Sequence, residues 1–503
     1  MSVHMFQKNI HKKNRNMRTF TFKGLLLTAV FALLGCLSIQ AADDDLITKQ
    51  ITINLDKAGT LPNKIASSEM YKITNLKIVG EINGTDWNMI REMAGRDNRG
   101  YSTEGKLSVL DLSEAKIVEG GDSYYPGDNC YTSNDEIGEK AFTDCSRLTS
   151  LTLPVGITSI GYDAFAYCSG LTSLTLPVGI TSIGEFAFSG CSGLTSLTLP
   201  ASITSIGEYA FYGCSGLTSL NLPAGITEIG ESTFSDCSGL TSLTLPDGIT
   251  SIGISAFAYC SGLTSLTLPA GITSINYGAF LDCSGLTSLT LPDGITSIGS
   301  RAFYGCSGLT SLTLPAGITS IGDDTFYGCS GLTSLTLPAG ITSIGEYAFS
   351  GCSGLTSLNL PAGITSIDKY AFSGCSRLTS LTLPAGITSI GEYAFSYCSG
   401  LTSIYVYAEK VPRIGRYAFE GCASRKGTLY VPKGTYDNYR LSEFGYFENI
   451  VEFDATGIDK TTTSTDVEEV SRYSLNGQRL VGPTKGLNIV KYSDGSVKKV
   501  AVE

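Results

Sequence analysis

Twelve cysteines recur at intervals of 23 residues between Cys145 and Cys398, and they are the side chains with the most evident chemistry. Regularly spaced thiols form disulfides, hold metal ions as thiolates, or fill small apolar positions in a core. Stacked copies would place neighbouring cysteines about 5 Å apart, within the Cα separation that a disulfide allows. Pairing alternate neighbours would break the repeat symmetry, and thiolates without basic neighbours are costly to bury. We therefore expect buried thiols, with disulfides as the alternative.

The chain is poor in the other groups that catalysis and metal binding use. Its two histidines, His4 and His11, fall within a predicted leader at 1–41, so a processed chain would have none. Histidine relays, histidine-activated nucleophiles and histidine metal sites are then excluded. Carboxylates are spread over variable repeat positions, with neither the spacing of a calcium loop nor a selected pair for glycoside hydrolysis. We predict no enzyme, no cofactor and no metal; a catalytic pocket, if present, would lie around Asp86 and Trp87.

Residues 1–41 have the pattern of a secretory signal peptide. Six basic residues precede the apolar run GLLLTAVFALLGCLS (24–38), and small residues follow at Ala41 and Ala42. The run is too short for a membrane span, and we expect no transmembrane segment elsewhere. Removing the six cations takes the net charge from −11 to −17, a surface that repels nucleic acid.

The elements that position these side chains are copies of one unit, such as CSGLTSLTLPAGITSIGEYAFSG (329–351). Leu335 and Leu337 share one face of a short strand, Pro338 ends it, and ITSI begins a second extended segment. The phrase EYAF suits a short helical turn with Ala348 and Phe349 inward. A single unit cannot bury its apolar side, so stacked units must share one interior. We predict an α/β repeat solenoid, a right-handed leucine-rich coil with one parallel strand ladder and short helical turns.

The periodicity also divides the chain into regions. After the leader, we expect an N-terminal cap with degenerate repeats at 42–144. Twelve repeats of 23 to 24 residues follow at 145–421, and a C-terminal cap lies at 422–453. A polar linker at 454–468 then leads to a small β-hairpin module at 469–503, which has turn signals at Asn476-Gly477 and Asp494-Gly495.

One column of exposed polar residues follows the predicted strand ladder. A solenoid commonly binds its partner on such a face, and the alternative is a solvated, strand-favouring surface with no ligand. The column consists of Thr152, Thr175, Thr198, Asn221, Thr244, Thr267, Thr290, Thr313, Thr336, Asn359, Thr382 and Tyr405.

A second column is aromatic and lies in the predicted turns. Exposed tyrosine is favoured at interfaces, whereas the alternative is partial packing between adjacent turns with the hydroxyl outward. The column consists of Phe186, Tyr209, Tyr347, Tyr370, Tyr393 and Tyr417, with Tyr212, Tyr304 and Tyr327 three positions further along the same turn.

The repeated pattern L-x-x-L-x-L-P-x-x-I-x-x-I-x-x-x-A-F-x-x-C resembles the BspA-like, or treponemal-type, leucine-rich repeat. It departs from the commoner leucine-rich consensus, which has Asn or Cys after L-x-L and no proline there. The resemblance covers about residues 70–453, including the flanking stretches 78–95 and 429–453. It implies a secreted or surface-attached protein, and it implies adhesion to host matrix proteins or to other bacteria.

Two short motifs resemble export or anchoring signals. The tail is similar to the C-terminal sorting domains of Bacteroidetes-type secretion, with Gly477, Lys485-Gly486 and Asp494-Gly495 in the corresponding places. Cys36 in LLGC resembles a lipidation site, although Leu34 is not the usual small residue there. The alternative for Cys36 is an ordinary signal-peptide residue.

These features predict a secreted protein of the cell surface or outer membrane that binds a protein or another surface macromolecule. Extracellular matrix is one partner class that the resemblance implies. The rival hypothesis is a structural surface spacer without a specific ligand, which the near-identity of the copies favours. The oligomeric state is left open.

Overall fold

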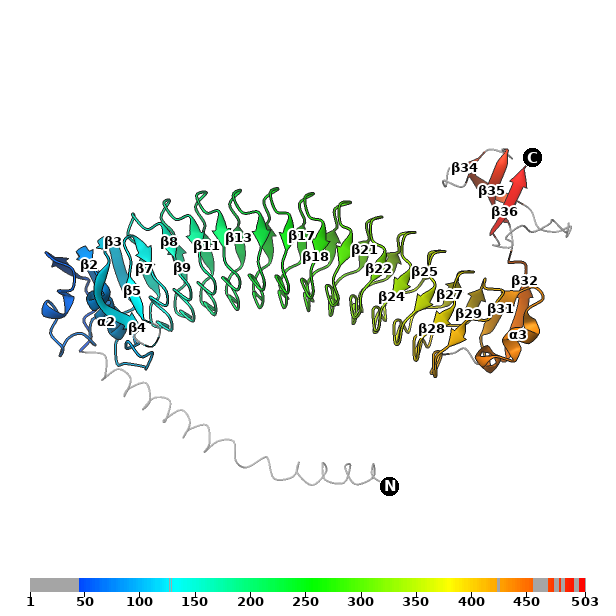
Figure 1. The fold of residues 1–503 in the computed structure, drawn as a ribbon, viewed down its shortest axis with the longest axis horizontal. Helices are drawn as coiled ribbons and strands as arrows, with labels where there is room; N and C mark the ends of the chain where they lie inside the picture. Colours follow the sequence, from blue (N-terminus) through cyan, green and yellow to red (C-terminus); the bar gives the residue numbers. More distant parts are fainter. Residues whose placement is uncertain are drawn as a thin grey trace, which may run out of the picture.

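The structure is a computed structural model that describes residues 45–125, 127, 129–422, 426–455, 469–474, 479–480, 485–492 and 497–502. The predicted leader with Cys36, most of the predicted linker and both hairpin turns of the tail lie outside the described residues. The repeats form a coil of stacked turns that follows a gentle arc (Figure 1). The predicted parallel-strand solenoid is confirmed.

The L-x-L segments form a first ladder of parallel strands. Successive strands pair with a register of one repeat, for example Leu151 with Leu174, and these leucines are buried between exposed neighbours. The expected single ladder is divided into several hydrogen-bonded sheets, because pairing is interrupted after β11, β15, β19 and β23. Its strands within the repeats are β7 (Ser150–Thr152), β9 (Ser173–Thr175), β11 (Ser196–Thr198), β13 (Ser219–Asn221), β15 (Ser242–Thr244), β17 (Ser265–Thr267), β19 (Ser288–Thr290), β21 (Ser311–Thr313), β23 (Ser334–Thr336), β25 (Leu358–Asn359), β27 (Ser380–Leu383) and β29 (Ser403–Val406).

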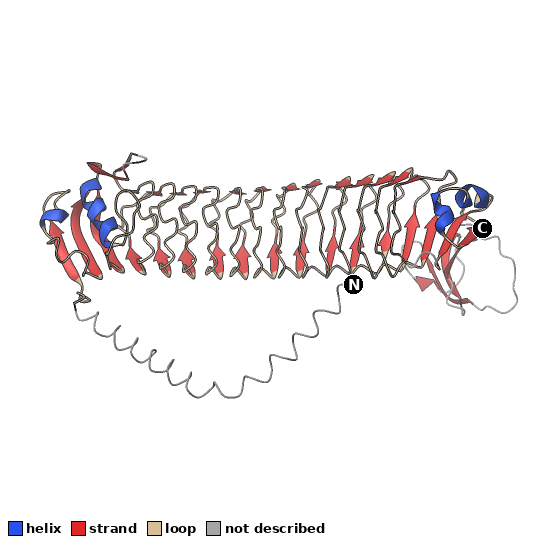
Figure 2. Cartoon of the chain, turned by 90° about the horizontal axis from the view of Figure 1, so that it is seen from below, coloured by secondary structure: helices blue, strands red, loops and turns tan. Residues whose placement is uncertain are grey.

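The sequence predicts only short extended segments at I-T-S-I. In the structure these segments pair between repeats and form a second parallel ladder. Strands lie along both long edges of the body in Figure 2. This ladder is interrupted after β12 and β20. Its strands are β6 (Glu136–Ile137), β8 (Ser159–Ile160), β10 (Ser182–Ile183), β12 (Ser205–Ile206), β14 (Glu228–Ile229), β16 (Ser251–Ile252), β18 (Ser274–Ile275), β20 (Ser297–Ile298), β22 (Ser320–Ile321), β24 (Ser343–Ile344), β26 (Ser366–Ile367), β28 (Ser389–Ile390) and β30 (Arg413–Ile414).

Each repeat then has a turn segment between the second ladder and the next cysteine, such as residues 345–351. The sequence predicts a short helical turn here, but the segment is a series of tight turns. The N–H groups of Tyr347, Phe349 and Gly351 donate to carbonyl oxygens of the next repeat at 3.0, 2.7 and 2.7 Å. Because these N–H groups point along the solenoid, they cannot form the hydrogen bonds within a helix. Tyr347 and Gly351 also adopt left-handed φ values of 54° and 74°. The turn segments therefore add a third row of hydrogen bonds between repeats.

One continuous interior runs through the repeats. The side chains of Leu332, Leu335, Ile341, Ala348 and Phe349 are buried, and their equivalents in other repeats extend the same columns. Thirteen phenylalanines from Phe142 to Phe419 stack in twelve successive pairs with centroids 5.1–5.7 Å apart. Because each unit covers the apolar side of its neighbour, the repeats are stable only as a stack.

The N-terminal end of this interior is closed by a cap. It comprises β1 (Ile51–Leu55), η1 (Leu61–Asn63), β2 (Asn75–Ile82), α2 (Gly84–Met93), β3 (Val109–Ile117), β4 (Gly120–Tyr125) and β5 (Cys130–Thr132). Strands β1, β2 and β3 extend the first ladder in parallel. Trp87 of α2 is buried with its ring 5.1 Å from that of Phe142, so the helix covers the first phenylalanine of the stack.

The C-terminal end is closed by β31 (Thr428–Pro432), α3 (Tyr436–Arg440), η3 (Glu443–Tyr446) and β32 (Asn449–Phe453). Phe419, the last ring of the stack, packs against Phe444 and Phe447 at 6.1 and 5.7 Å. The tail is a separate antiparallel sheet of order β34-β33-β35-β36, with β33 (Glu469–Ser474), β34 (Arg479–Leu480), β35 (Gly486–Tyr492) and β36 (Val497–Val502). Within it, buried Arg472 donates to Asn488 Oδ1 at 3.2 Å.

Candidate binding surfaces

The polar column predicted from the sequence lies on the first ladder, where strand alternation turns every second side chain away from the leucine core. We call its nine candidate residues the threonine face. All nine are exposed, and none has a side-chain hydrogen bond to another described residue. The residues are Thr175, Thr198, Asn221, Thr244, Thr267, Thr290, Thr313, Thr336 and Asn359.

Another threonine column on the same side of the coil is used internally. Thr333 Oγ1 donates to the backbone oxygen of Thr310 at 3.1 Å, and Thr310 donates to Thr287 in the same way at 3.4 Å. These hydroxyls reinforce the stacking of repeats. The contrast is one of donors: the hydroxyls of the neighbouring column donate within the coil, whereas no threonine-face side chain makes a hydrogen bond to another described residue.

The aromatic column lies on the turn segments and is only half buried. Tyr347 stacks on Tyr370 with centroids 4.6 Å apart, and Tyr370 stacks on Tyr393 at 4.9 Å. Tyr304 and Tyr327 stack at 4.7 Å, and Tyr327 meets Tyr347 edge to face at 6.4 Å. The row therefore brings together both tyrosine positions that the sequence suggested. It continues to Tyr417, whose centroid is 5.1 Å from that of Tyr393. We call Tyr304, Tyr327, Tyr347, Tyr370, Tyr393 and Tyr417 the tyrosine ribbon.

The ribbon is electrostatically distinct from the threonine face. Burial, together with the neighbouring tyrosine and acidic residues, raises the pKa of Tyr304 and Tyr347 above that of an ordinary phenol. Of the fourteen acidic residues in 145–397, eleven lie in turn segments, against two of the four basic residues. The turn segments therefore form an acidic, aromatic side of the coil.

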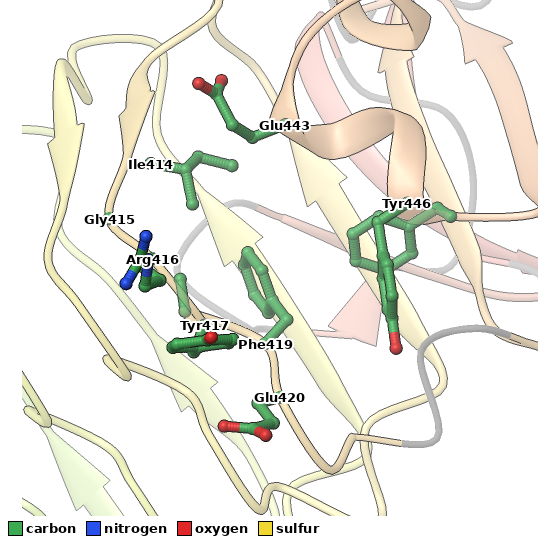
Figure 3. Close-up of a pocket in the computed structure, with 10 residues that line it drawn as sticks. Ile414, Gly415, Arg416, Tyr417, Phe419, Glu420, Glu443 and Tyr446 are labelled. Atoms are coloured by element: carbon green, nitrogen blue, oxygen red, sulfur yellow. The ribbon is translucent and has the colours of Figure 1, made fainter.

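A recess of about 630 Å³ lies where the last repeat meets the C-terminal cap (Figure 3). Phe419 and Phe447 form its apolar lining, and Tyr417 links it to the tyrosine ribbon. The Arg416 guanidinium carbon lies 5.6 Å from the centroid of the Tyr417 ring. The remaining lining residues are Ile414, Gly415, Ala418, Glu420, Glu443 and Tyr446. Sequence reasoning missed this recess; its only signal was the aromatic content of the predicted cap.

The cysteine column lies in the interior. Each repeat thiol is unbridged and buried in this structure, as in Cys306, whose Sγ donates to the Phe280 oxygen at 3.1 Å. Burial raises the pKa of the Cys306 thiol to about 12. These thiols therefore lack the exposure and the lowered pKa of reactive cysteines.

Asp86 and Trp87, around which the sequence places any catalytic pocket, both have structural partners. The Asp86 carboxylate is fully buried and accepts hydrogen bonds from the backbone N–H groups of Gly59, Leu61 and Asn83 at 2.6, 2.8 and 3.0 Å. The last of these belongs to the capping box of α2. Trp87 Nε1 donates to the Ala141 oxygen at 2.9 Å. These contacts fix the helix over the end of the solenoid.

The described residues contain neither a cluster of metal-binding side chains nor a membrane-spanning helix. No group of three or more histidine, cysteine or carboxylate side chains could hold a metal ion there. No helix among the described residues has the length and apolar character that crossing a bilayer requires.

The strand ladders and the L-x-x-L-x-L units define a leucine-rich repeat solenoid. A model of the BspA type leucine rich repeat region, in six copies, matches residues 135–264, 227–330, 250–375 and 296–426. Because these matches cover more than half of the chain, the protein belongs to the BspA-type leucine-rich repeat family.

Several solved structures are similar to this chain. A leucine-rich repeat protein from Bacteroides ovatus is 28% identical, with a TM-score of 0.52, over 64% of this chain and 88% of that one. A leucine rich cell surface protein from Faecalibacterium prausnitzii is also 28% identical, with a TM-score of 0.41, over 58% of this chain and 86% of its own. No curated protein matches the sequence.

Proposed function

We propose that this protein is a secreted, cell-surface repeat protein that binds other proteins or surface macromolecules and has no enzymatic activity. The observation that carries the proposal is the threonine face, a long row of exposed polar side chains that make no side-chain hydrogen bonds to other described residues. Repeat solenoids present extended surfaces of this kind to partners. Many weak contacts along a regular surface add up against a repetitive target, such as a matrix fibre or a cell envelope.

The second candidate is a structural spacer without a specific ligand. It is favoured by the near-identity of the repeats, since the threonine-face position holds only Thr or Asn in the eleven copies from 145 to 397. A surface that recognises one irregular partner would vary at such positions. A spacer would show no saturable binding to any surface.

Binding of the full chain to immobilised extracellular-matrix proteins and to fixed bacterial cells separates these two functions. We expect saturable binding that weakens at least tenfold when Thr267, Thr290 and Thr313 are replaced by lysine, because three ammonium groups would disrupt a neutral contact surface. Lysines at exposed Val155, Val178 and Ala201 add the same charge in a different loop and serve as the control. Absence of saturable binding, or equal loss in both variants, would contradict the proposal.

Surface attachment is the second part of the proposal. The leader pattern and the tail motif support export, with either Cys36 as a lipid anchor or the tail as a sorting signal. Mass spectrometry of the exported protein decides between them. A mature N-terminus next to Ala41 or Ala42 with loss of the tail supports sorting, whereas a lipid-modified Cys36 supports a lipoprotein. An intact leader on all of the protein would contradict export.

A further inference from the structure

The differences between repeats are concentrated on one side of the coil. Among the eleven copies from 145 to 397, the position of Glu346 holds six residue types and the position of Tyr347 also holds six. The position of Thr336 holds two. Specific recognition depends on particular side chains placed on a common fold, so it belongs where the copies differ. That side is formed by the turn segments.

Aromatic rings on this side form one continuous feature that ends in a cavity. The tyrosine ribbon runs from Tyr304 to Tyr417 through three stacked contacts, one edge-to-face contact and one tilted contact, and Tyr417 also lines the recess (Figure 3). Four aromatic rings line the recess, those of Tyr417, Phe419, Tyr446 and Phe447. Its volume lies within the range of pockets that bind small ligands or single side-chain groups. A long partner could therefore lie along the ribbon and place one side chain in the recess.

The charge of the turn segments selects the partner. Eleven acidic and two basic residues give the turn segments between residues 145 and 397 a net charge of −9. A surface of this charge attracts cationic partners and repels anionic ones. The threonine face offers no comparable field, because its nine residues are uncharged.

The chemistry of the recess fits an arginine or lysine side chain. Parallel stacking covers ring faces within the pair Tyr304–Tyr327 and within the run Tyr347–Tyr370–Tyr393, whereas the last ring, Tyr417, is tilted by 33° to Tyr393. The Arg416 guanidinium carbon lies 5.6 Å from the Tyr417 centroid, so Tyr417 already makes a cation–π contact within the chain, and exposed Tyr446 is the other tyrosine ring of the recess. Phe419 and Phe447 suit the aliphatic part of such a side chain. Exposed carboxylates of Glu420 and Glu443 lie at two ends of the recess (Figure 3).

We propose that the tyrosine ribbon and the recess at its end form the docking surface for a basic segment of a protein partner. An arginine or lysine of that segment occupies the recess, and the remaining cationic residues follow the acidic turn segments. This inference rests on the proposed function as a binding protein, and it adds to the threonine face a second contact surface on the turn segments, with a partner of stated chemistry.

A set of three peptides tests the charge requirement with the full chain. We expect acetyl-Arg-Ala-Arg-Ala-Arg-amide to bind saturably by isothermal titration calorimetry at low salt, and to bind more weakly as sodium chloride screens the charges. The peptide with citrulline in place of arginine has almost the same shape but no charge, and we expect it to bind at least tenfold more weakly. The peptide with glutamate at those positions should not bind.

Two variants test the location, and each has a matched control. Glycine is compatible with the left-handed backbone at Tyr393 and Tyr417, with φ of 55° and 60°, so Tyr393→Gly with Tyr417→Gly removes the rings without straining the turns. Its control is Ser232→Gly with Ser255→Gly, at the same repeat position outside the ribbon.

The pair Glu420→Gln and Glu443→Gln removes the recess carboxylates. Its control, Asp247→Asn with Asp293→Asn, changes the charge equally in exposed loops.

We expect at least fivefold weaker binding of the arginine peptide for both test variants and unchanged binding for both controls. Equal binding of the citrulline peptide, binding of the glutamate peptide, or test variants that behave like their controls would overturn the inference. Saturable binding to matrix proteins or cells without any arginine-peptide binding would overturn it while leaving the proposed function intact. Loss of all macromolecular binding would instead contradict the proposed function itself.

Discussion

The repeated cysteine is a small core residue with a specific hydrogen-bonding role. From Cys168 to Cys398 each repeat thiol donates to the carbonyl oxygen of the phenylalanine 26 residues earlier, as Cys283 does to Phe257 at 3.0 Å. That carbonyl also accepts from the backbone N–H of Cys260 at 3.2 Å, so the thiol is its second donor in the buried interior. The sequence alone indicates a buried thiol, but not its partner, because the partner depends on how the turn segment is folded.

These buried thiols predict an instability at alkaline pH. The pKa of Cys306 is raised from 9.0 to about 12 in the folded protein, so the folded state keeps a proton that the unfolded state loses above about pH 9. The stability that this contributes is fully present below pH 9 and is lost as the pH rises towards 12. We expect the urea midpoint, followed by circular dichroism, to fall between about pH 8 and pH 10.5.

The matched variant is Cys283→Ala with Cys306→Ala. It should be less stable at pH 8 by about 2 kcal/mol, because two buried donors and some packing are lost. It should then lose less of its remaining stability between pH 8 and pH 10.5. A midpoint that does not change with pH in the parent chain would show that the thiols do not control alkaline unfolding.

At the scale of single elements, the turn segment is the part of the repeat with strained backbone. Non-glycine residues adopt left-handed φ at the same position of successive repeats, including Ser255 at 51°, Arg301 at 59° and Tyr370 at 56°. Gly278 occupies that position in one repeat with φ of 58°. Left-handed backbone costs a non-glycine residue about 1–2 kcal/mol, so the inter-repeat hydrogen bonds must offset a cost in nearly every turn.

Replacement of Ser255 by glycine should therefore stabilise the protein. The relief of left-handed strain exceeds the added entropy of glycine in the unfolded chain, which is about 0.5–1 kcal/mol, so we expect a net gain of about 0.5–1 kcal/mol. Ser251→Gly, in strand β16 of the same repeat, is the control and should destabilise by about 0.5–1 kcal/mol. Urea unfolding measures both, and a similar loss in the two variants would exclude backbone strain at Ser255.

The same element shows where prediction from sequence succeeds and fails. Alternating leucines and the following proline specify the first strand, because both signals are local in the chain. The turn segment is not helical because its donors pair with residues 22 positions away, as Phe349 does with Ala371. The recess was unpredictable for a related reason. It forms where residues 414–420 of the last repeat meet 443–447 of a cap that has no repeat pattern.

At the scale of the whole molecule, the protein is a one-dimensional stack with different ends. Each repeat contacts its neighbours through two strand ladders, the turn-segment hydrogen bonds and the phenylalanine stack. Trp87 closes the stack at one end, and Phe444 and Phe447 close it at the other. Stability in such an array is approximately a sum of unit and interface contributions, so the number of repeats is adjustable while the caps are required.

Deletion of one whole repeat, residues 283–305, should leave the fold intact. The new junction joins Asp282 to Cys306, so Phe280 would stack on Phe326 with the geometry it now has with Phe303, at 5.6 Å. We expect an unchanged circular dichroism signal per residue, one cooperative transition with a lower urea midpoint, and a molecule about 5 Å shorter by small-angle scattering.

Deletion of residues 283–294, about half a repeat, places a strand opposite a turn and should yield a protease-sensitive, aggregating chain. If the whole-repeat deletion unfolds like the half-repeat deletion, then interactions beyond nearest neighbours hold the solenoid together, and the additive description of its stability is wrong.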